Sequence, residues 1–314
     1  MLLVSVKSCN FAIALSNASE MRETRYYKVA GHGFSVTAEG SDFGMMENYA
    51  PFSCDNVAAD GTKEAQERAF VLGIEEGEAP VYAEEMRQEE EGQEIVCGRT
   101  EDGRPLFEFR WWQQTAGWLV CAKNYGEGQL IIKAGPQRKM AIDNALMVLY
   151  ALATADKGTV LFHAAVVSHQ GRAYMFLGKS GTGKSTHAGL WVRHIGGTEL
   201  VNDDNPVVRL DGEGQAVAYG SPWSGKTPCY RNVCYPLDGI VLLSQAPYNQ
   251  IEPLKGLAAY AALVPSISGM RWDTLIAEGL HQTENTLAST VPTWHLACLP
   301  DKAAAELCQQ TIEK

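Results

Sequence analysis

The sequence has no excess of positive charge, no membrane-length apolar run and no paired cysteine motif. Its 26 Lys and Arg residues are outnumbered by 37 Asp and Glu residues, and the net charge is −11. The chain therefore lacks the electrostatic footprint of a nucleic-acid-binding protein. No stretch reaches the roughly 18 apolar residues that a membrane-spanning helix needs. We expect neither a nucleic-acid partner nor a membrane partner.

The eight cysteines carry no paired metal-ligand spacing and no CxxC motif. A chain of 314 residues with 46% hydrophobic residues can build a core without disulfides. We therefore expect reduced thiols and a cytoplasmic location.

The first fifteen residues, MLLVSVKSCNFAIAL, only faintly resemble a signal peptide, because polar residues interrupt the apolar run and no basic segment precedes it. A misassigned start codon is an alternative, since Met21 lies just before a strand-like segment. Residues 1–20 would then be a dispensable extension.

Residues 1–135 are predicted to form a small N-terminal β-rich domain. Short strands are expected at 26–30 and 34–38, and PLFEFRWWQ, AGWLVCAKN and GQLIIKAG have the pattern of consecutive hairpins. The alternation of Phe107, Phe109 and Trp111 predicts one shared buried face. The acidic stretch 75–94 is interpreted as a solvated helix or loop.

Residues 136–314 are predicted to form a second, α/β domain that begins with a buried helix at 136–155. TVLFHAAVVSH and RAYMFLG should form a hairpin of apolar strands, and a helix should cover 184–194. Further strands are expected at TELVN, PVVRL, AVAYG and TWHLACL, and helical stretches at 271–289 and 301–313.

The segment FLGKSGTGKSTHAGLWV, residues 176–192, fits the phosphate-binding loop pattern G-x4-G-K-[ST], with an apolar strand before it and a helix after it. Glycines let backbone N–H groups surround phosphate oxygens, and a helix N-terminus adds partial positive charge. Lys184 would reach the β- and γ-phosphates, and the Ser185 hydroxyl would ligate Mg²⁺. The alternative is a plain glycine-rich turn.

Asp203 and Asp204 lie at the end of a predicted strand, 19 and 20 residues after Lys184. Two carboxylates beside a phosphate loop can divide the work, one completing the Mg²⁺ shell and the other accepting a proton from an attacking hydroxyl. A polar turn is the alternative. His163 is a third candidate, because it lies on the strand that feeds the loop; a core histidine is its alternative.

The segments LFHAAVV, FLGKSGTGKST and VNDD resemble the catalytic domain of the HPr kinase/phosphorylase family and of ATP-type phosphoenolpyruvate carboxykinases. GSPWSGKT, residues 220–227, is similar to a bacterial subfamily of HPr-kinase-like proteins of mostly unassigned substrate. The resemblance covers residues 136–314 and, more loosely, the small N-terminal β-domain from YYKVAG onward.

This resemblance implies that Asp203 is a metal-side acid, Asp204 the general base and His163 a polarising or proton-sharing partner. It also implies that the loop residues bind the ATP phosphates: Gly178, Lys179, Ser180, Gly181, Thr182, Gly183, Lys184, Ser185 and Thr186. Thr186 stands where true HPr kinases commonly have an acidic residue, and the HPr-docking signature is not recognisable. HPr itself is therefore not the expected substrate.

In SPWSGKT, Lys226 could bring a cation to the γ-phosphate or the acceptor, with Arg231 a weaker second cation. The alternative is a surface turn in which Trp223 covers a core edge. His187, inside the loop helix, is expected to be structural.

Together these features predict a Mg²⁺- and ATP-dependent kinase acting on a hydroxyl, with serine in a peptide or protein as the favoured acceptor. The alternatives are a nucleotide-binding sensor or scaffold without transfer, a small-molecule kinase, and a carboxykinase-like enzyme or plain NTPase. A homo-oligomer is left open.

Overall fold

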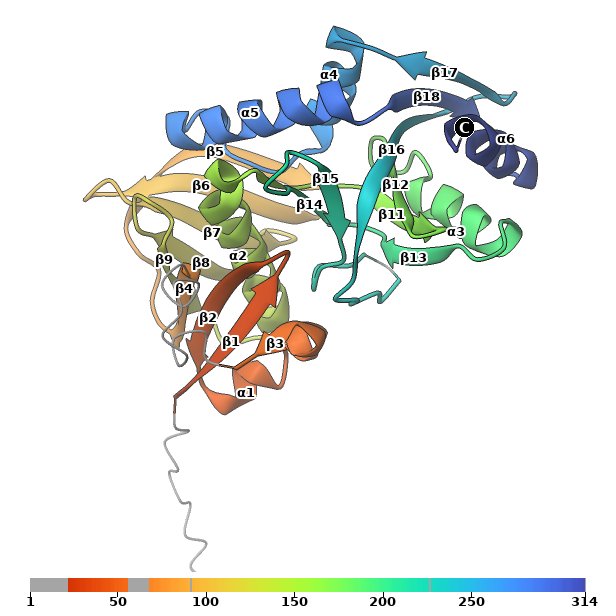
Figure 1. The fold of residues 1–314 in the computed structure, drawn as a ribbon. Helices are drawn as coiled ribbons and strands as arrows, with labels where there is room; N and C mark the ends of the chain where they lie inside the picture. The colour runs from red at the N-terminus through yellow and green to blue at the C-terminus, as the bar shows by residue number, and fades with distance from the viewer. Residues whose placement is uncertain (1–21, 56–67, 91, 226, 314) are drawn as a thin grey trace, which may run out of the picture.

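The protein is a mixed α/β structure with two large mixed sheets, seen in a computed structural model that describes residues 22–55, 68–90, 92–225 and 227–313 (Figure 1). The proposed extension at 1–20 lies outside these ranges. Over the part of the chain that is described, no helix has the length and apolar character needed to cross a membrane. The cysteines within the same ranges are free thiols.

The first sheet has nine strands in the order β3-β1-β2-β4-β9-β8-β7-β6-β5. Its antiparallel hairpins β1–β2, β7–β8 and β8–β9 confirm the strands predicted for this part of the chain. Two short helical segments, α1 (Gly40–Phe43) and η1 (Glu47–Phe52), follow β2. The strands are β1 (Glu23–Val29), β2 (His32–Ala38), β3 (Ser53–Cys54), β4 (Arg68–Glu76), β5 (Tyr82–Glu90), β6 (Gln93–Thr100), β7 (Pro105–Trp111), β8 (Gln114–Cys121) and β9 (Glu127–Ile132).

The acidic stretch 75–94 consists mainly of β-strands, so its interpretation as a solvated helix or loop is wrong. It includes the end of β4, all of β5 and the first residues of β6. Most β5 side chains are exposed, because β5 is the edge strand of the sheet. An edge strand with little to bury lacks the apolar alternation by which a strand is recognised.

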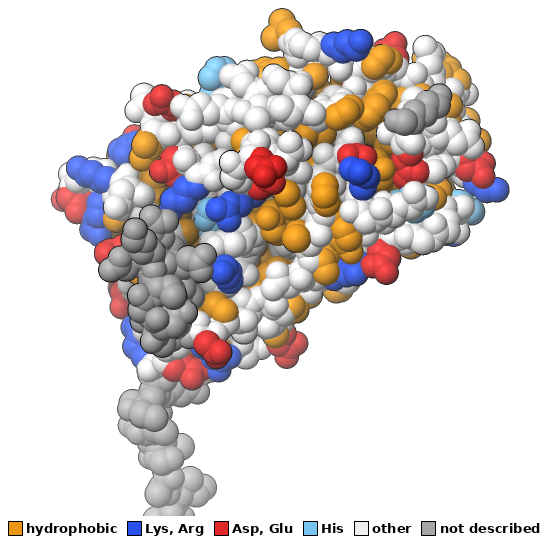
Figure 2. All heavy atoms as spheres, in the orientation of Figure 1, with side chains coloured by type: hydrophobic (Ala, Val, Ile, Leu, Met, Phe, Trp, Pro, Cys, Tyr) orange, Lys and Arg blue, Asp and Glu red, His pale blue; other side chains and the backbone are white. Residues whose placement is uncertain are grey.

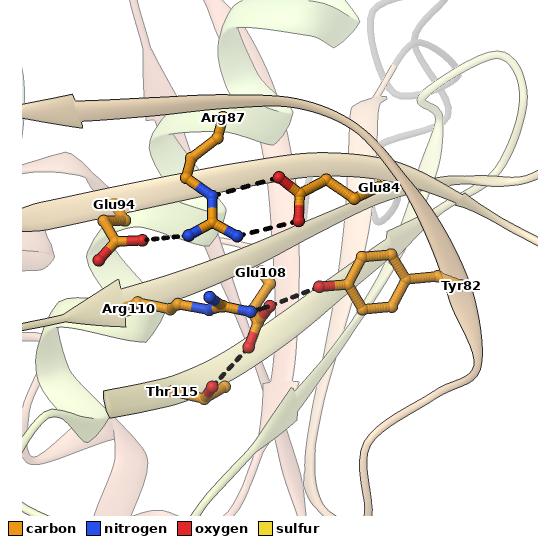
Figure 3. A network of polar contacts seen from close by, with 7 residues as sticks. All are labelled: Tyr82, Glu84, Arg87, Glu94, Glu108, Arg110 and Thr115. Carbon is orange, nitrogen blue, oxygen red and sulfur yellow. Dashed lines mark hydrogen bonds and ion pairs between the residues drawn. The ribbon is translucent and has the colours of Figure 1, made fainter. Parts of the chain in front are cut away.

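A polar network crosses the face of the first sheet over β5, β6, β7 and β8 (Figure 3). At its centre the buried carboxylate of Glu108 accepts hydrogen bonds from Tyr82, Arg110 and Thr115. Burial would raise the pKa of Glu108, but these donors outweigh it and lower the pKa below its ordinary value. Phe107 and Phe109 alternate with Glu108 and lie in the core on the opposite face, as predicted, while Trp111 is only half-buried.

Helix α2 (Arg138–Thr154) joins the two halves of the molecule and matches the predicted buried helix. It contacts β4, β7, β8 and β9 of the first sheet and β10 of the second. Its first residue, Arg138, is itself buried and donates to Asp42 (2.6 Å) and to Glu76 of the first sheet. Apolar side chains on most sides of α2 are therefore covered by protein.

The second sheet runs β10-β14-β15-β16-β12-β11-β13, and β18 and β17 extend it beyond β16. Strands β12, β16 and β18 are parallel neighbours, so their carboxyl ends meet at one edge. The strands are β10 (Thr159–Leu161), β11 (Ala165–His169), β12 (Arg172–Leu177), β13 (Glu199–Asn202), β14 (Val207–Leu210), β15 (Ala216–Tyr219), β16 (Cys234–Gln245), β17 (Gln250–Leu254) and β18 (Thr293–Cys298).

Helices α3 and α6 pack against each other, α5 contacts η3 and β10, and α4 packs against α5 (Figure 1). The predicted helix at 184–194 is confirmed as α3, and the tail helices as α5 and α6. The helical segments are η3 (Ala155–Lys157), α3 (Lys184–His194), α4 (Leu257–Leu263), η4 (Val264–Ser266), α5 (Thr274–Thr290) and α6 (Lys302–Ile312).

TVLFHAAVVSH is two strands and not one. β10 pairs with β14, whereas β11 pairs with β12 and β13, and His163 lies between them. Backbone bonds redirect the chain there: His163 N–H donates to Ser266 O (2.7 Å) and Ala164 N–H to Asp204 O (2.9 Å). The predicted β11–β12 hairpin is confirmed, and its turn places Gln170 and Gly171 at φ 50° and 77°.

One hydrophobic core cluster contains residues of both sheets and of α2, among them Phe34, Leu149, Met175 and Ile240. A second cluster lies between the second sheet and helices α3 and α6. The division into domains at 135/136 stays a prediction. On the face drawn in Figure 2, acidic and basic side chains are interspersed and do not form patches of one sign.

His187 gives the fold an acid sensitivity that can be measured. It is buried in α3, where Trp191 Nε1 donates to its Nε2 (3.2 Å), and burial lowers its pKa from 6.5 to about 4. The unfolded chain binds the proton more readily, so stability from this group is present above pH 6.5 and is lost as the pH falls toward 4. Between pH 7 and 5 we expect a loss of about 2 kcal/mol from His187.

Urea unfolding of His187→Asn should show a correspondingly smaller drop over that interval. His194→Asn, in which the replaced histidine is exposed on the same helix, should keep the wild-type drop. Equal pH dependence in all three proteins would contradict a buried neutral His187.

Candidate active site

The glycine loop lies between β12 and α3, as its sequence predicts. Gly178, Gly181 and Gly183 have φ values of 153°, 75° and 110°, a region that favours glycine. Thr182 N–H donates to Lys179 O (3.1 Å) and closes the turn, and Gly183 is the N-cap of α3. The N-terminus of an eleven-residue helix therefore follows the loop directly.

Lys184 lies at the base of this loop and is 7% exposed. Its ammonium group donates to Gly178 O (3.0 Å) and Lys179 O (3.5 Å), two carbonyls of the loop itself. Burial lowers the pKa of Lys184, and the carboxylates of Asp204 and Glu90 oppose that effect. A lysine held by carbonyl groups can exchange those partners for a phosphate oxygen at small cost.

The two aspartates and His163 come together at the end of β13. His163 Nε2 is 3.8 Å from Asp204 Oδ1, and both side chains are 36% exposed. Asn205 Nδ2 donates to the other Asp204 oxygen (2.8 Å). Burial raises the pKa of Asp204 above its ordinary value; the His163 imidazole opposes this rise and the Asp203 carboxylate adds to it.

Asp203 is more deeply buried than Asp204 and is held by the segment 221–225. Its Oδ1 accepts hydrogen bonds from Ser224 Oγ (3.1 Å) and from Gly225 N–H (3.0 Å). A Cβ at Gly225 would lie 3.1 Å from Asp204 Cβ and 3.2 Å from Asp203 Oδ1, so only glycine fits without displacement. The segment 221–225 is therefore in direct contact with Asp203.

Three expectations for this region have different outcomes. Lys226 lies outside the described residues, so its predicted role is untested. Arg231 pairs with Glu199 (2.6 Å) and donates to Leu200 O (2.8 Å), so its guanidinium group is held by two partners other than the aspartates. Trp223 is 5% exposed and belongs to the main core, so it does more than cover the core edge.

The structure brings in two side chains that sequence reasoning missed. Gln245, at the carboxyl end of β16, donates to the loop carbonyls of Gly181 (3.2 Å) and Thr182 (3.4 Å). Asn202 accepts from Asp204 N–H (2.9 Å) and donates to Trp223 O (3.1 Å). Only the long-range pairing of the strands puts them there, although Asn202 stands directly before the aspartate pair.

Glu90, the last residue of β5, is a third addition from the first sheet. Its carboxylate partly opposes the lowering of the pKa of Lys184 by burial, and it makes a small addition to the raised pKa of Asp204. The tip of the β5–β6 hairpin therefore contributes negative charge to a site that otherwise lies in the second sheet.

The donors available to a metal are few. Among the described residues, no group of three or more His, Cys, Asp or Glu side chains is arranged to hold an ion. The remaining donor set is oxygen, from Asp203, Asp204 and the exposed Ser185 in the first turn of α3. Mg²⁺ typically takes one or two protein carboxylates together with phosphate oxygens and water, so this donor set fits it.

Comparison with known proteins places the chain in a family. It belongs to the family described as SynChlorMet cassette protein ScmC, whose model matches residues 133–298. No curated protein matches the chain. Among solved structures, the HPr(Ser) kinase/phosphatase from Coxiella burnetii is similar at 12% identity and a TM-score of 0.30, over 49% of this chain and 88% of that one. These values are too low to transfer a property between the two chains.

The position of Glu90 predicts a charge effect on anion binding. Glu90→Gln removes a negative charge from the vicinity of Lys184, so MgATP should bind about two- to threefold more tightly at low salt. The gain should shrink above about 0.5 M salt because of screening. Calorimetric titration measures both. Glu89→Gln, an exposed neighbour on the same strand, is the control, and an equal effect there would remove Glu90 from the site.

Proposed function

We propose that this chain is a Mg²⁺- and ATP-dependent phosphotransferase that acts on a hydroxyl group, with serine in a peptide or protein as the acceptor. The observation that carries the proposal is one constellation: a glycine loop before α3, a buried Lys184 at its base, and the His163–Asp204 pair beside Asp203. Phosphoryl transfer requires mainly positioning and charge neutralisation, which such a set can supply.

Each residue has a separable role in this proposal. Residues 178–186 cradle the phosphates, and Lys184 leaves its loop carbonyls to bind the β- and γ-phosphate oxygens. Asp204 accepts the proton of the acceptor hydroxyl, and His163 shares or polarises that proton across the 3.8 Å contact. The raised pKa of Asp204 makes it a stronger base than an ordinary carboxylate once it is ionised.

Asp203 and Ser185 would hold Mg²⁺. When bound, the ion neutralises charge on the phosphates. The hydrogen bonds from Ser224 and Gly225 fix the orientation of the Asp203 carboxylate, which is the geometric requirement for a ligand. The N-terminus of α3 follows the loop directly and would favour the negative charge of the phosphates.

An enzyme is favoured over a nucleotide sensor by the contact between His163 and Asp204. A protein that only bound nucleotide would have no use for a half-exposed acid–base pair beside the loop. A small hydroxylated metabolite remains the alternative acceptor, and transfer from labelled ATP to peptides and to small alcohols would separate the two.

The first test is nucleotide binding. MgATP at 100 times its dissociation constant should stabilise the fold by about 2.7 kcal/mol, which a thermal shift assay detects. Lys184→Ala should lose most of that shift, because the phosphate-binding cation is gone. Lys179→Ala removes an exposed lysine of the same loop, and this variant should keep more of the MgATP-induced thermal shift than Lys184→Ala. A wild-type melting temperature that does not respond to millimolar MgATP would refute the phosphate-binding role.

The second test separates binding from chemistry. Asp204→Asn should bind MgATP within a few-fold of wild type but transfer phosphate about 10²–10⁴-fold more slowly, the usual effect of losing a general base. Wild-type transfer should rise with pH as Asp204 loses its proton, and burial places that rise above the ordinary pKa of an aspartate. Asp203→Asn should instead weaken metal binding. The opposite pattern would reverse the two roles, and full activity in both variants would leave the pair as a structural turn.

A further inference from the structure

The segment 221–225 links the aspartate pair to the first half of the chain. It has no strand or helix of its own, so discrete hydrogen bonds must determine where it lies. At its carboxyl end, Ser224 and Gly225 donate to Asp203. At its amino end, Ser221 Oγ donates to Asn205 O (2.6 Å), directly after Asp204.

Asn202 ties the middle of the segment to the other aspartate. It is fully buried, and its Nδ2 donates to Trp223 O and to Ser221 Oγ (both 3.1 Å). Its Oδ1 accepts from the backbone N–H of Asp204 (2.9 Å). A displacement of Trp223 would therefore change the hydrogen bonds that hold Asp203, through Ser224 and Gly225. It would also change the bond from Asn202 to the backbone of Asp204.

Two residues of η1 hold the segment from the other side. Trp223 Nε1 donates to Tyr49 Oη (2.9 Å), and Asn48 Nδ2 donates to Pro222 O (3.0 Å). Tyr49 is completely buried, and its ring meets the Trp223 ring edge to face at 6.3 Å. Without the Tyr49 hydroxyl, the indole N–H would be a buried donor without its partner, a state costly enough to move the side chain.

We propose that Tyr49 is a positioning residue for the aspartate pair and acts through Trp223. This inference rests on the proposed phosphotransferase function. The glycine loop is held by hydrogen bonds from Lys184 and Gln245 to its own carbonyl groups. Nucleotide binding should therefore be insensitive to substitution of Tyr49. Metal binding at Asp203 and proton transfer at Asp204 depend on the segment, so both should weaken when the Tyr49–Trp223 bond is lost.

The test is Tyr49→Phe, which removes one hydroxyl and keeps the ring. The matched control is Tyr150→Phe: Tyr150 is equally buried and packs 5.1 Å from the Trp223 ring, but its hydroxyl donates to Val29 O (3.0 Å). Mn²⁺ affinity in the presence of ADP, measured by the electron paramagnetic resonance of the free ion, gives a readout independent of turnover. We expect Tyr49→Phe to weaken Mn²⁺ binding and to lower kcat about tenfold, with KM for ATP within twofold of wild type. Tyr150→Phe should change none of these.

A second variant tests the same hydrogen bond from the side of Trp223. Trp223→Phe removes the other partner of the same bond together with part of a buried ring, and the Tyr49 hydroxyl also interacts with Asp143. The double variant should therefore lose less than the sum of the two single variants, because the Tyr49–Trp223 bond is common to both. If Tyr49→Phe and Tyr150→Phe have equal effects on Mn²⁺ affinity and kcat, Tyr49 is only a packing residue. Additive losses in the double variant would also overturn the proposal.

The two proposals fail in different ways. If wild type binds MgATP and Lys184→Ala does not, while Tyr49→Phe behaves as wild type, the positioning role alone is wrong. If wild type binds neither Mn²⁺ with ADP nor MgATP, both the positioning role and the phosphotransferase function are wrong.

Discussion

The burial of helix α2 between the two sheets is the constraint on which the rest of the structure depends. An apolar helix of seventeen residues can remain folded in water only if its sides are covered, and each sheet covers part of it. The core around α2 is consequently shared: Phe34 and Met175 belong to one cluster although they lie in different sheets. Because the two halves close over the same helix, side chains from η1 and from β5 reach a site whose main parts belong to the second sheet.

The parts of the candidate site that sequence predicts are those in which chemistry and local conformation coincide. Lys184 follows glycines that permit its loop, and α3 begins at the expected residue, directly after Gly183, whose φ of 110° ends the loop. The partners of these residues could not be predicted in the same way. Asn202 and Gln245 are ordinary polar residues at strand ends, and their importance comes from tertiary hydrogen bonds that span 21 and 64 positions of the chain.

Strands and helices with one buried apolar face could be predicted from the sequence. The prediction failed for elements whose apolar pattern is weak. Strands β7, β8 and β9 have apolar faces and were recognised, whereas β5 has almost nothing to bury and was interpreted as a helix or loop. At His163, the apolar run continues through a change of partner strand, which only the pairing with β14 on one side and β12 on the other reveals. The strand β16, at the centre of the second sheet, was not predicted, because Pro236 and Gly239 interrupt its apolar residues.

The exposed strand β5 bears on how copies of this protein behave toward one another. A nine-residue sheet edge is a template on which another chain can add a strand, the first step of amyloid-like association. Here Glu84, Glu85, Glu89 and Glu90 line that edge, and the pairing with β6 is irregular between Glu84 and Met86. Glu84 and Glu85 are paired with Arg87 and Arg99, while Glu89 and Glu90 are exposed, so a second edge would meet a row of charged side chains along an irregular register. Charged side chains and an irregular register disfavour strand addition at an exposed sheet edge, so we expect β5 to resist edge-to-edge association between copies of the protein.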